Sequence, residues 1–305
     1  MAVQVAIPKD LEAFSSHFNA FKSRSSPKSP CNSSLFVPFD GHMGHKVDLP
    51  SVPSLCPSWS RTQNPHLASI QSDFKAWINS SFKDTAMKAK VLDFNAPLFA
   101  ALSYPHTSRK QLLTIAECIA WYFPTLDTAI TTSADQKPPN NADAYLTSRE
   151  LANVSIFPLL GLIHYAHGSE LPVAYSHKEN KTMAKLWKEI ARISVLSNDI
   201  LALRGEVLHA RHESLVPLLM KDGDLDAQDA MDQVADMVRD ALARFEDAER
   251  ELAGQVEEGA RKDVEGYVRA CRDLVVGQLE WSFGLKGGVG QSLVVEDGTV
   301  IFYVR

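Results

Sequence analysis

The sequence predicts an all-α protein, a single helical bundle preceded by an irregular, proline-rich N-terminal arm. Three observations favour this class. Apolar residues recur every three or four positions from about residue 66 onward, which is the period of an amphipathic helix. Eight of the 16 prolines fall within the first 65 residues, where they prevent long helices. The alternation of apolar and polar residues that marks a half-buried strand is confined to the end of the chain.

The composition is that of an ordinary folded protein of 305 residues. Its apolar share of 45% and charged share of 22% differ from those of disordered, collagen-like and membrane-spanning chains. A net charge of −6 argues against a general nucleic-acid binder. No stretch reaches the roughly 18 uninterrupted apolar residues of a membrane span, and the first residues lack the pattern of a secretion signal. We therefore expect a cytoplasmic protein.

The N-terminal arm is expected to span residues 1–57. Its Ser23–Pro30 stretch, SRSSPKSP, combines serines and prolines in a way that regular helices do not tolerate. Apolar residues such as Leu35 and Phe36 nevertheless offer surface to bury, so partial docking on the body is expected. The helical domain then spans residues 58–290.

Helical patterns follow one another along this domain. The first covers His66–Phe82. Ser108 and Gln111 form a capping-box pattern ahead of the second. Pro124 interrupts that second pattern, so Asp127 is expected either just beyond a kink or at a helix end. Further helices are expected at Tyr145–His167, Asn180–Met220, Ala227–Leu252 and Arg261–Phe283.

The C-terminal tail, residues 291–305, is expected to be a hairpin flap. Within Ser292–Val304, two runs rich in β-branched residues flank Glu296, Asp297 and Gly298. A short acidic turn that ends in glycine between two such runs is a hairpin signal.

The most informative segment is Ser194–Met220. Within it, Asn198, Ala202 and Glu206 are spaced four and four, so on a helix they occupy one stripe about 12 Å long. An amide oxygen and a carboxylate on one rigid stripe suit Mg²⁺, which prefers oxygen ligands. The spacing alone is also compatible with a solvated polar stripe.

Longer matches point to a known family. NDILALRGE, residues 198–206, resembles the magnesium-binding motif of class I terpene synthases, usually written N-D-x-x-S-x-x-x-E. Residues 58–78 and 98–127 are similar to the corresponding parts of fungal sesquiterpene cyclases. GQLEWSF, residues 277–283, resembles the segment before their final Arg-Tyr pair. Together the matches cover about residues 55–290.

The resemblance implies a helical bundle that closes over an aromatic pocket, binds magnesium ions and ionises a prenyl diphosphate, farnesyl diphosphate being the first choice. The metals and basic side chains stabilise the departing diphosphate, and ring faces stabilise the carbocation. The resemblance assigns metal binding to Asp127, Asn198 and Glu206 and recognition of the diphosphate to Arg149. The candidate catalytic residues are Asp127, Glu206 and Asp199, with Glu206 or Asp127 as the proton handler if the fold is repurposed.

The chain departs from the family pattern at three places. The aspartate-rich motif, D-D-x-x-D, reads DTAIT at Asp127–Thr131, so two of its carboxylates are absent. Asp135 lies eight residues after Asp127, beyond the expected end of the helix, and is not expected to replace them. Ala202 stands where the family has Ser or Thr. Gly287 and Gly288 align with the Arg and Tyr that grip the diphosphate. We therefore expect fewer Mg²⁺ ions than the three of the family.

Other conspicuous side chains have two readings each. Trp121, Phe123 and Trp281 either contribute to substrate binding as pocket-lining rings or pack in the core. His164 and His167 share one helix face, but no acidic third ligand lies at a convincing distance, so they are expected at the surface or in the core.

Three functions are open from the sequence. The first is a terpene synthase, a carbon–oxygen lyase that acts on a prenyl diphosphate with Mg²⁺. The second is a repurposed cyclase fold that guides C–N or C–C bond formation on a terpenoid or amine substrate in an acidic, aromatic pocket. The third is a catalytically silent relative that binds a terpenoid or a partner enzyme. The sequence leaves a homodimer open.

Overall fold

The computed structural model describes residues 46–50, 55–132, 156–167, 171–209, 214–284, 294–296 and 299–303. For α6 beyond Tyr122 and for α9 beyond Ile200, the description extends to the backbone alone. The described helices are α3 (Leu67–Ser81), α4 (Thr85–Phe94), α5 (Ala96–Ser103), α6 (Arg109–Thr132), α8 (Ile156–His167), α9 (Lys181–His209), α10 (Leu215–Gly223), α11 (Ala227–Gln255) and α12 (Arg261–Gly284), with short 3₁₀ helices η3 (Val173–Tyr175) and η4 (Glu258–Ala260).

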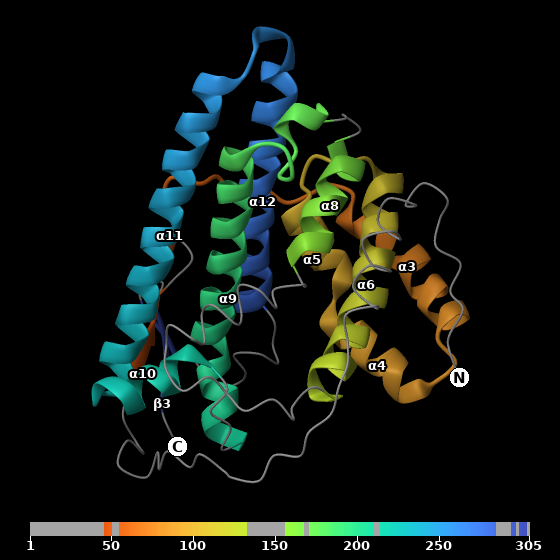
Figure 1. The fold of residues 1–305 in the computed structure, drawn as a ribbon. Coiled ribbons are helices and arrows are strands. Elements are labelled where there is room, and N and C mark those ends of the chain that lie inside the picture. Colours follow the sequence, from red (N-terminus) through yellow and green to blue (C-terminus); the bar gives the residue numbers. More distant parts are fainter. Residues whose placement is uncertain are drawn as a thin grey trace.

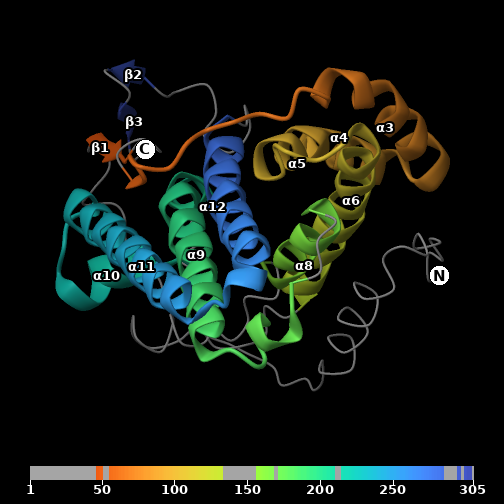
Figure 2. The same ribbon diagram turned by 90° about the horizontal axis from the view of Figure 1, so that it is seen from above.

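The helices form one bundle around α12. Helix α12 lies between α9 on one side and α5 and α8 on the other, and α11 covers the outer side of α9 (Figures 1 and 2). Apolar residues from all these helices form a single buried cluster. No helix in the described ranges has the length and apolar character needed to cross a bilayer. The all-α bundle predicted from the sequence is thus confirmed.

The amphipathic patterns account for the long helices. Helix α3 buries Ile70, Phe74 and Ile78, which recur every four residues on the face that meets the bundle. The capping box before α6 is confirmed, because the Ser108 N–H donates to Gln111 Oε1 at 3.2 Å and the Gln111 N–H donates to Ser108 Oγ at 3.4 Å.

Three helix boundaries differ from those predicted. Helix α6 continues through Pro124 to Thr132, so Asp127 does not lie at a helix end, and the other expectation, a position just beyond a kink at Pro124, stays a prediction. Asn180–Met220 is two helices, because α9 ends at His209 and α10 begins at Leu215. Helix α8 begins at Ile156, and residues 145–155 of the helix predicted there lie outside the described residues.

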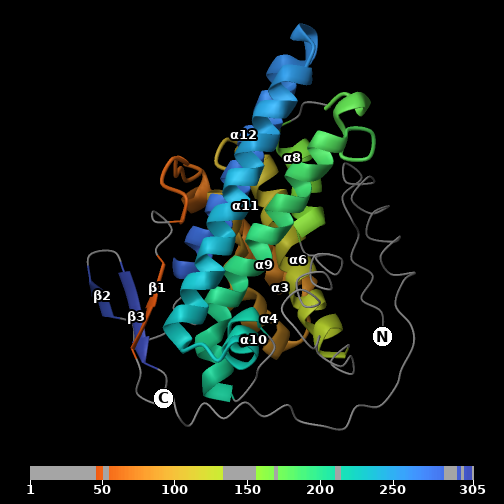
Figure 3. The same cartoon turned by 60° about the vertical axis from the view of Figure 1, so that its left-hand side comes forward.

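A small antiparallel sheet was predicted only in part. Strands β2 (Val294–Glu296) and β3 (Thr299–Tyr303) form the expected C-terminal hairpin. Strand β1 (Lys46–Leu49) comes from the N-terminal arm and pairs with β3, which gives the order β1-β3-β2 (Figure 3). The β1 pairing was missed, because its partner is far away in the sequence.

Strand β1 also docks on α11. Val47 and Leu49 are buried, and the Asp48 N–H donates to Gln228 Oε1 at 2.7 Å. The Gln228 side-chain amide returns a bond to the Asp48 carbonyl at 3.3 Å, so it covers the outer edge of β1 as another strand would. This part of the arm therefore packs on the body. The boundary between residues 57 and 58 stays a prediction.

Candidate functional site

The predicted metal stripe lies on one uninterrupted helix. Helix α9 runs from Lys181 to His209, so Asn198, Ala202 and Glu206 occupy successive turns of the same element. The Asn198 side chain is exposed, whereas the neighbouring Asp199 is buried. The amide oxygen of Asn198 is thus accessible to a ligand from outside the packed core. The side chain of Glu206 lies outside the described residues.

Position 127 is on α6, and its side chain lies outside the described residues. Ala116 and Ala120 precede it by eleven and seven residues, which is close to three and two full turns. Both alanines are fully buried, so the face of α6 that carries them is turned toward the bundle. The C-terminal ends of α6 and α9 lie at the same end of the bundle (Figures 1 and 3).

A partly buried polar contact joins α9 to α12 one turn before Asn198. Ser194 Oγ donates to Gln278 Oε1 at 2.9 Å. Ser194 is 5% exposed. On α12, Ser282 Oγ donates to the Gln278 carbonyl at 2.8 Å. This pair was not predicted from the sequence, although a serine among apolar residues and a glutamine beside the WSF segment were visible signals.

Trp281 packs in an aromatic cluster with two phenylalanines. Its ring centroid lies 4.6 Å from that of Phe94 and 5.2 Å from that of Phe99. The indole N–H donates to the Phe94 carbonyl at 3.1 Å. These contacts join the end of α12 to α4 and α5. A role of Trp281 in substrate binding stays a prediction.

The remaining candidates are placed in part. Trp121 is half-buried on α6. The side chain of Phe123 lies outside the described residues, and so do Arg149, Asp135 and the two glycines at 287 and 288.

The donors on α9 are chemically suited to a hard divalent cation. An amide oxygen that is exposed and a carboxylate two turns later are both oxygen ligands, the type that Mg²⁺ selects. Within the described ranges, no cluster of three or more His, Cys, Asp or Glu side chains could hold a metal ion. The side chains of Asp127 and Glu206 lie outside those ranges.

The two histidines of α8 lie in a second group of titratable side chains. The His164 ring lies 4.8 Å from that of Tyr267 on α12, measured between centroids. Burial lowers the pKa of His164, with a further lowering from His167. Burial also lowers the pKa of His167, and the nearby charges of His106 and Arg269 lower it further.

These shifts predict an acid-sensitive fold. A histidine whose folded-state pKa is lowered below its ordinary value of 6.5 stabilises the fold above that pH, and this stabilisation is lost as the pH falls. We expect the melting temperature of the wild type to decrease when the pH is lowered from about 7.5 to about 5.5. The double variant His164→Gln, His167→Gln should show a smaller decrease. An equal decrease in the two proteins would contradict this assignment.

A comparison with known proteins shows which family the chain belongs to. A family model described as "Terpene synthase family 2, C-terminal metal binding" matches residues 59–244. Terpene cyclase braA of Annulohypoxylon truncatum is 30% identical over 150 residues, 49% of this chain and 40% of its own. Sesquiterpene synthase Agr1 of Cyclocybe aegerita is 29% identical over 145 residues, 44% of this chain and 38% of its own. The chain thus spans about two fifths of these relatives.

Solved structures share the fold. Germacradien-4-ol synthase from Streptomyces citricolor superposes with a TM-score of 0.58 at 15% identity, over 73% of this chain and 96% of its own. A hedycaryol synthase in complex with nerolidol gives a TM-score of 0.58 at 17% identity, with the same coverage of each chain. At such identities the likeness concerns the arrangement of helices.

Proposed function

Because the chain belongs to terpene synthase family 2, we propose that it ionises a prenyl diphosphate with the help of Mg²⁺ and cyclises the resulting carbocation. Farnesyl diphosphate is the proposed substrate. The observation that carries the proposal is the uninterrupted helix α9, whose backbone carries Asn198 and Glu206 on one stripe inside the matched family domain.

Three oxygen-bearing residues would hold the metal. Asn198 and Glu206 would bind from α9, and Asp127 would bind from α6. Ala202 offers no oxygen between the first two, so water or a diphosphate oxygen would complete the octahedral shell there. When bound, Mg²⁺ would neutralise the charge that develops on the departing diphosphate. With two carboxylates of the aspartate-rich motif absent, fewer ions than three are proposed.

The chain itself would supply recognition, shielding and a proton acceptor. Arg149 would recognise the diphosphate, and the rings of Trp121, Phe123 and Trp281 would border the hydrocarbon part of the substrate. Ring faces attract cations, and a site without water protects a carbocation from capture. Among the candidate catalytic residues Asp127, Glu206 and Asp199, Glu206 or Asp127 would accept the proton that the final carbocation releases.

Incubation with farnesyl diphosphate tests the proposal. Purified protein with millimolar Mg²⁺ is expected to release a cyclic hydrocarbon or terpene alcohol, detected by gas chromatography with mass spectrometry. A chelator in excess should stop product formation, because the diphosphate then loses its counter-charge. Absence of any product from farnesyl and geranyl diphosphate, under conditions where a known cyclase works, would overturn the proposal.

Two further assays distinguish the other functions that the sequence left open. Turnover that needs an amine or terpenoid substrate and survives the chelator would indicate the repurposed fold. Full activity of a pathway after alanine replacement of Asp127, Asn198 and Glu206 together would indicate a silent relative. The cytoplasmic location, a homodimer and the domain limits 1–57, 58–290 and 291–305 are proposals as well, and fractionation, sedimentation and limited proteolysis test them.

A further inference from the structure

We propose that Gln278 of α12 is a positioning residue: by accepting the hydrogen bond of Ser194, it fixes the rotation of α9 and so the direction in which Asn198 presents its amide. This role rests on the metal site proposed above. It concerns the geometry of the site, since Gln278 would not touch the metal ion or the substrate.

The contact is suited to this role by its place. Ser194 lies one turn before Asn198 on α9, so the two share a stripe. Helices α9 and α12 run in the same direction through the bundle (Figure 1). The 2.9 Å bond between Ser194 and Gln278 therefore also sets which turn of α12 stands level with Asn198.

Apolar packing alone would specify this rotation poorly. Ile190 lies one turn before Ser194 on α9 and Leu274 lies one turn before Gln278 on α12, and both side chains are buried. Such side chains lose little when a helix turns slightly, because dispersion contacts have no strong direction. A buried hydroxyl that loses its acceptor is left unsatisfied, so the polar pair penalises any rotation that breaks it.

The required accuracy shows why a positioning residue would matter. Side-chain atoms stand roughly 5–6 Å from the axis of a helix, so a rotation of about 20° moves them by about 2 Å. This displacement is as long as a whole Mg²⁺–oxygen bond, which is about 2.0–2.1 Å. A loosened α9 would thus retain its fold and still miss the coordination geometry.

The test uses two substitutions that remove the bond from either side. Gln278→Met keeps the length of the side chain and removes the acceptor, and Ser194→Ala removes only the donor hydroxyl. The readout is the Mg²⁺ concentration that gives half of the thermal stabilisation by inorganic pyrophosphate, because a ligand of the folded state raises the melting temperature. We expect each variant to raise this concentration about tenfold.

Further variants distinguish positioning from a general loss of stability. Gln278→Glu retains an acceptor oxygen and should restore a Mg²⁺ midpoint near that of the wild type. The double variant Ser194→Ala, Gln278→Met should be no worse than either single variant, because both remove one shared interaction. If Gln278→Met does not fold, Ser194→Ala carries the test.

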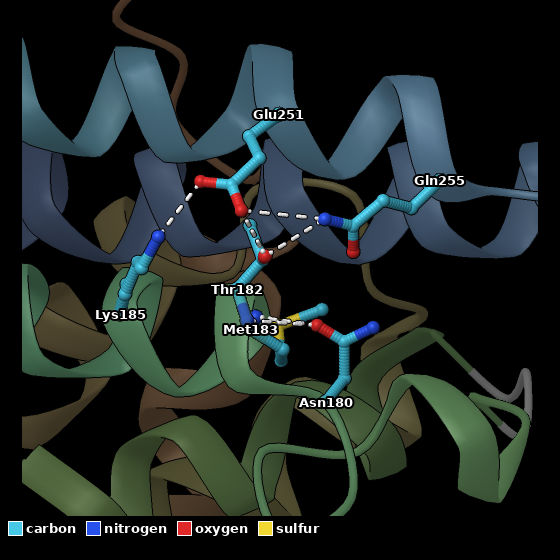
Figure 4. A network of polar contacts seen from close by, with 6 residues as sticks. All are labelled: Asn180, Thr182, Met183, Lys185, Glu251 and Gln255. Carbon is cyan, nitrogen blue, oxygen red and sulfur yellow. Dashed lines mark hydrogen bonds and ion pairs between the residues drawn. The ribbon is translucent and has the colours of Figure 1, made fainter.

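A matched control lies at the opposite end of α9. Gln255 of α11 donates to Thr182 Oγ1 at 3.1 Å, in a network that also joins Lys185 to Glu251 at 2.8 Å (Figure 4). Asn180 caps the same helix end by accepting from the Thr182 N–H at 2.9 Å. Gln255→Met removes a comparable bond to α9 far from Asn198, so it should lower the melting temperature and leave the Mg²⁺ midpoint unchanged.

The outcomes separate this role from the proposed function. A Mg²⁺ midpoint in Gln278→Met that moves no more than in Gln255→Met would overturn the positioning role and leave the metal site standing. A wild type that gains no stability from Mg²⁺ and pyrophosphate would overturn the metal site, and the positioning role with it.

Discussion

Replacing Gly277 by alanine is expected to destabilise the protein by about 3 kcal/mol or more. Helix α12 crosses α5 at this residue so closely that a Cβ atom would overlap the Leu102 carbonyl carbon and stand 2.5 Å from the Leu102 oxygen and the Ser103 nitrogen. These are backbone atoms, so no side chain can move aside, and the two helices must separate. We expect the melting temperature to fall by about 6–12 °C, measured by circular dichroism.

Gly266 on the same helix provides the control. A Cβ atom there would meet nothing within 4 Å, so alanine adds no overlap. Because alanine loses less backbone entropy than glycine in a helix, Gly266→Ala should be neutral or stabilising by about 0.5–1 kcal/mol. Similar melting temperatures for the two variants would show that α5 and α12 do not touch through their backbones at Gly277.

The long helices could be predicted from the sequence, whereas the short helices and strand β1 could not. Helices α3, α11 and α12 are long and carry a regular apolar stripe, so periodicity identified them. Helices α4 and α5 were missed, because they are short and are separated only by Asn95, whose φ of 53° ends one helix just before the next begins. Pro97 in the first turn of α5 was the signal that the sequence offered. Strand β1 obtains its hydrogen bonds from β3, so four residues in isolation carried little signal.

The candidate site also has one part that the sequence predicts and one part that it does not. The stripe of Asn198, Ala202 and Glu206 is local, because its members lie on one helix and their spacing defines their common face. The contact between Ser194 and Gln278 depends on how two helices pack, and nothing near either residue specifies the partner. Local periodicity thus predicts which residues share a helix face, whereas tertiary packing decides what that face contacts.

The largest effect on activity is expected from Glu206→Gln, which should lower kcat/KM for farnesyl diphosphate by about a hundredfold or more. A carboxylate ligand carries a full charge, and an amide in its place offers the same shape with a weaker oxygen. A hundredfold loss corresponds to about 2.7 kcal/mol of transition-state stabilisation, which is within the several kcal/mol that metal-assisted departure of a diphosphate supplies. The loss of kcat/KM is measured from the rate of product formation at saturating and at low Mg²⁺.

Glu189→Gln on the same helix is the matched substitution. Glu189 is buried and accepts a hydrogen bond from Arg244 Nε at 3.0 Å, so its loss should lower the melting temperature. Glu189 lies more than two turns before Asn198. We therefore expect the Glu189→Gln variant to have the kcat/KM and the Mg²⁺ dependence of the wild type. Glu206→Gln should show the reverse pattern, a near-normal melting temperature with little product. If both variants lose activity only in proportion to their stability, Glu206 is a structural residue and α9 carries no metal ligand at that position.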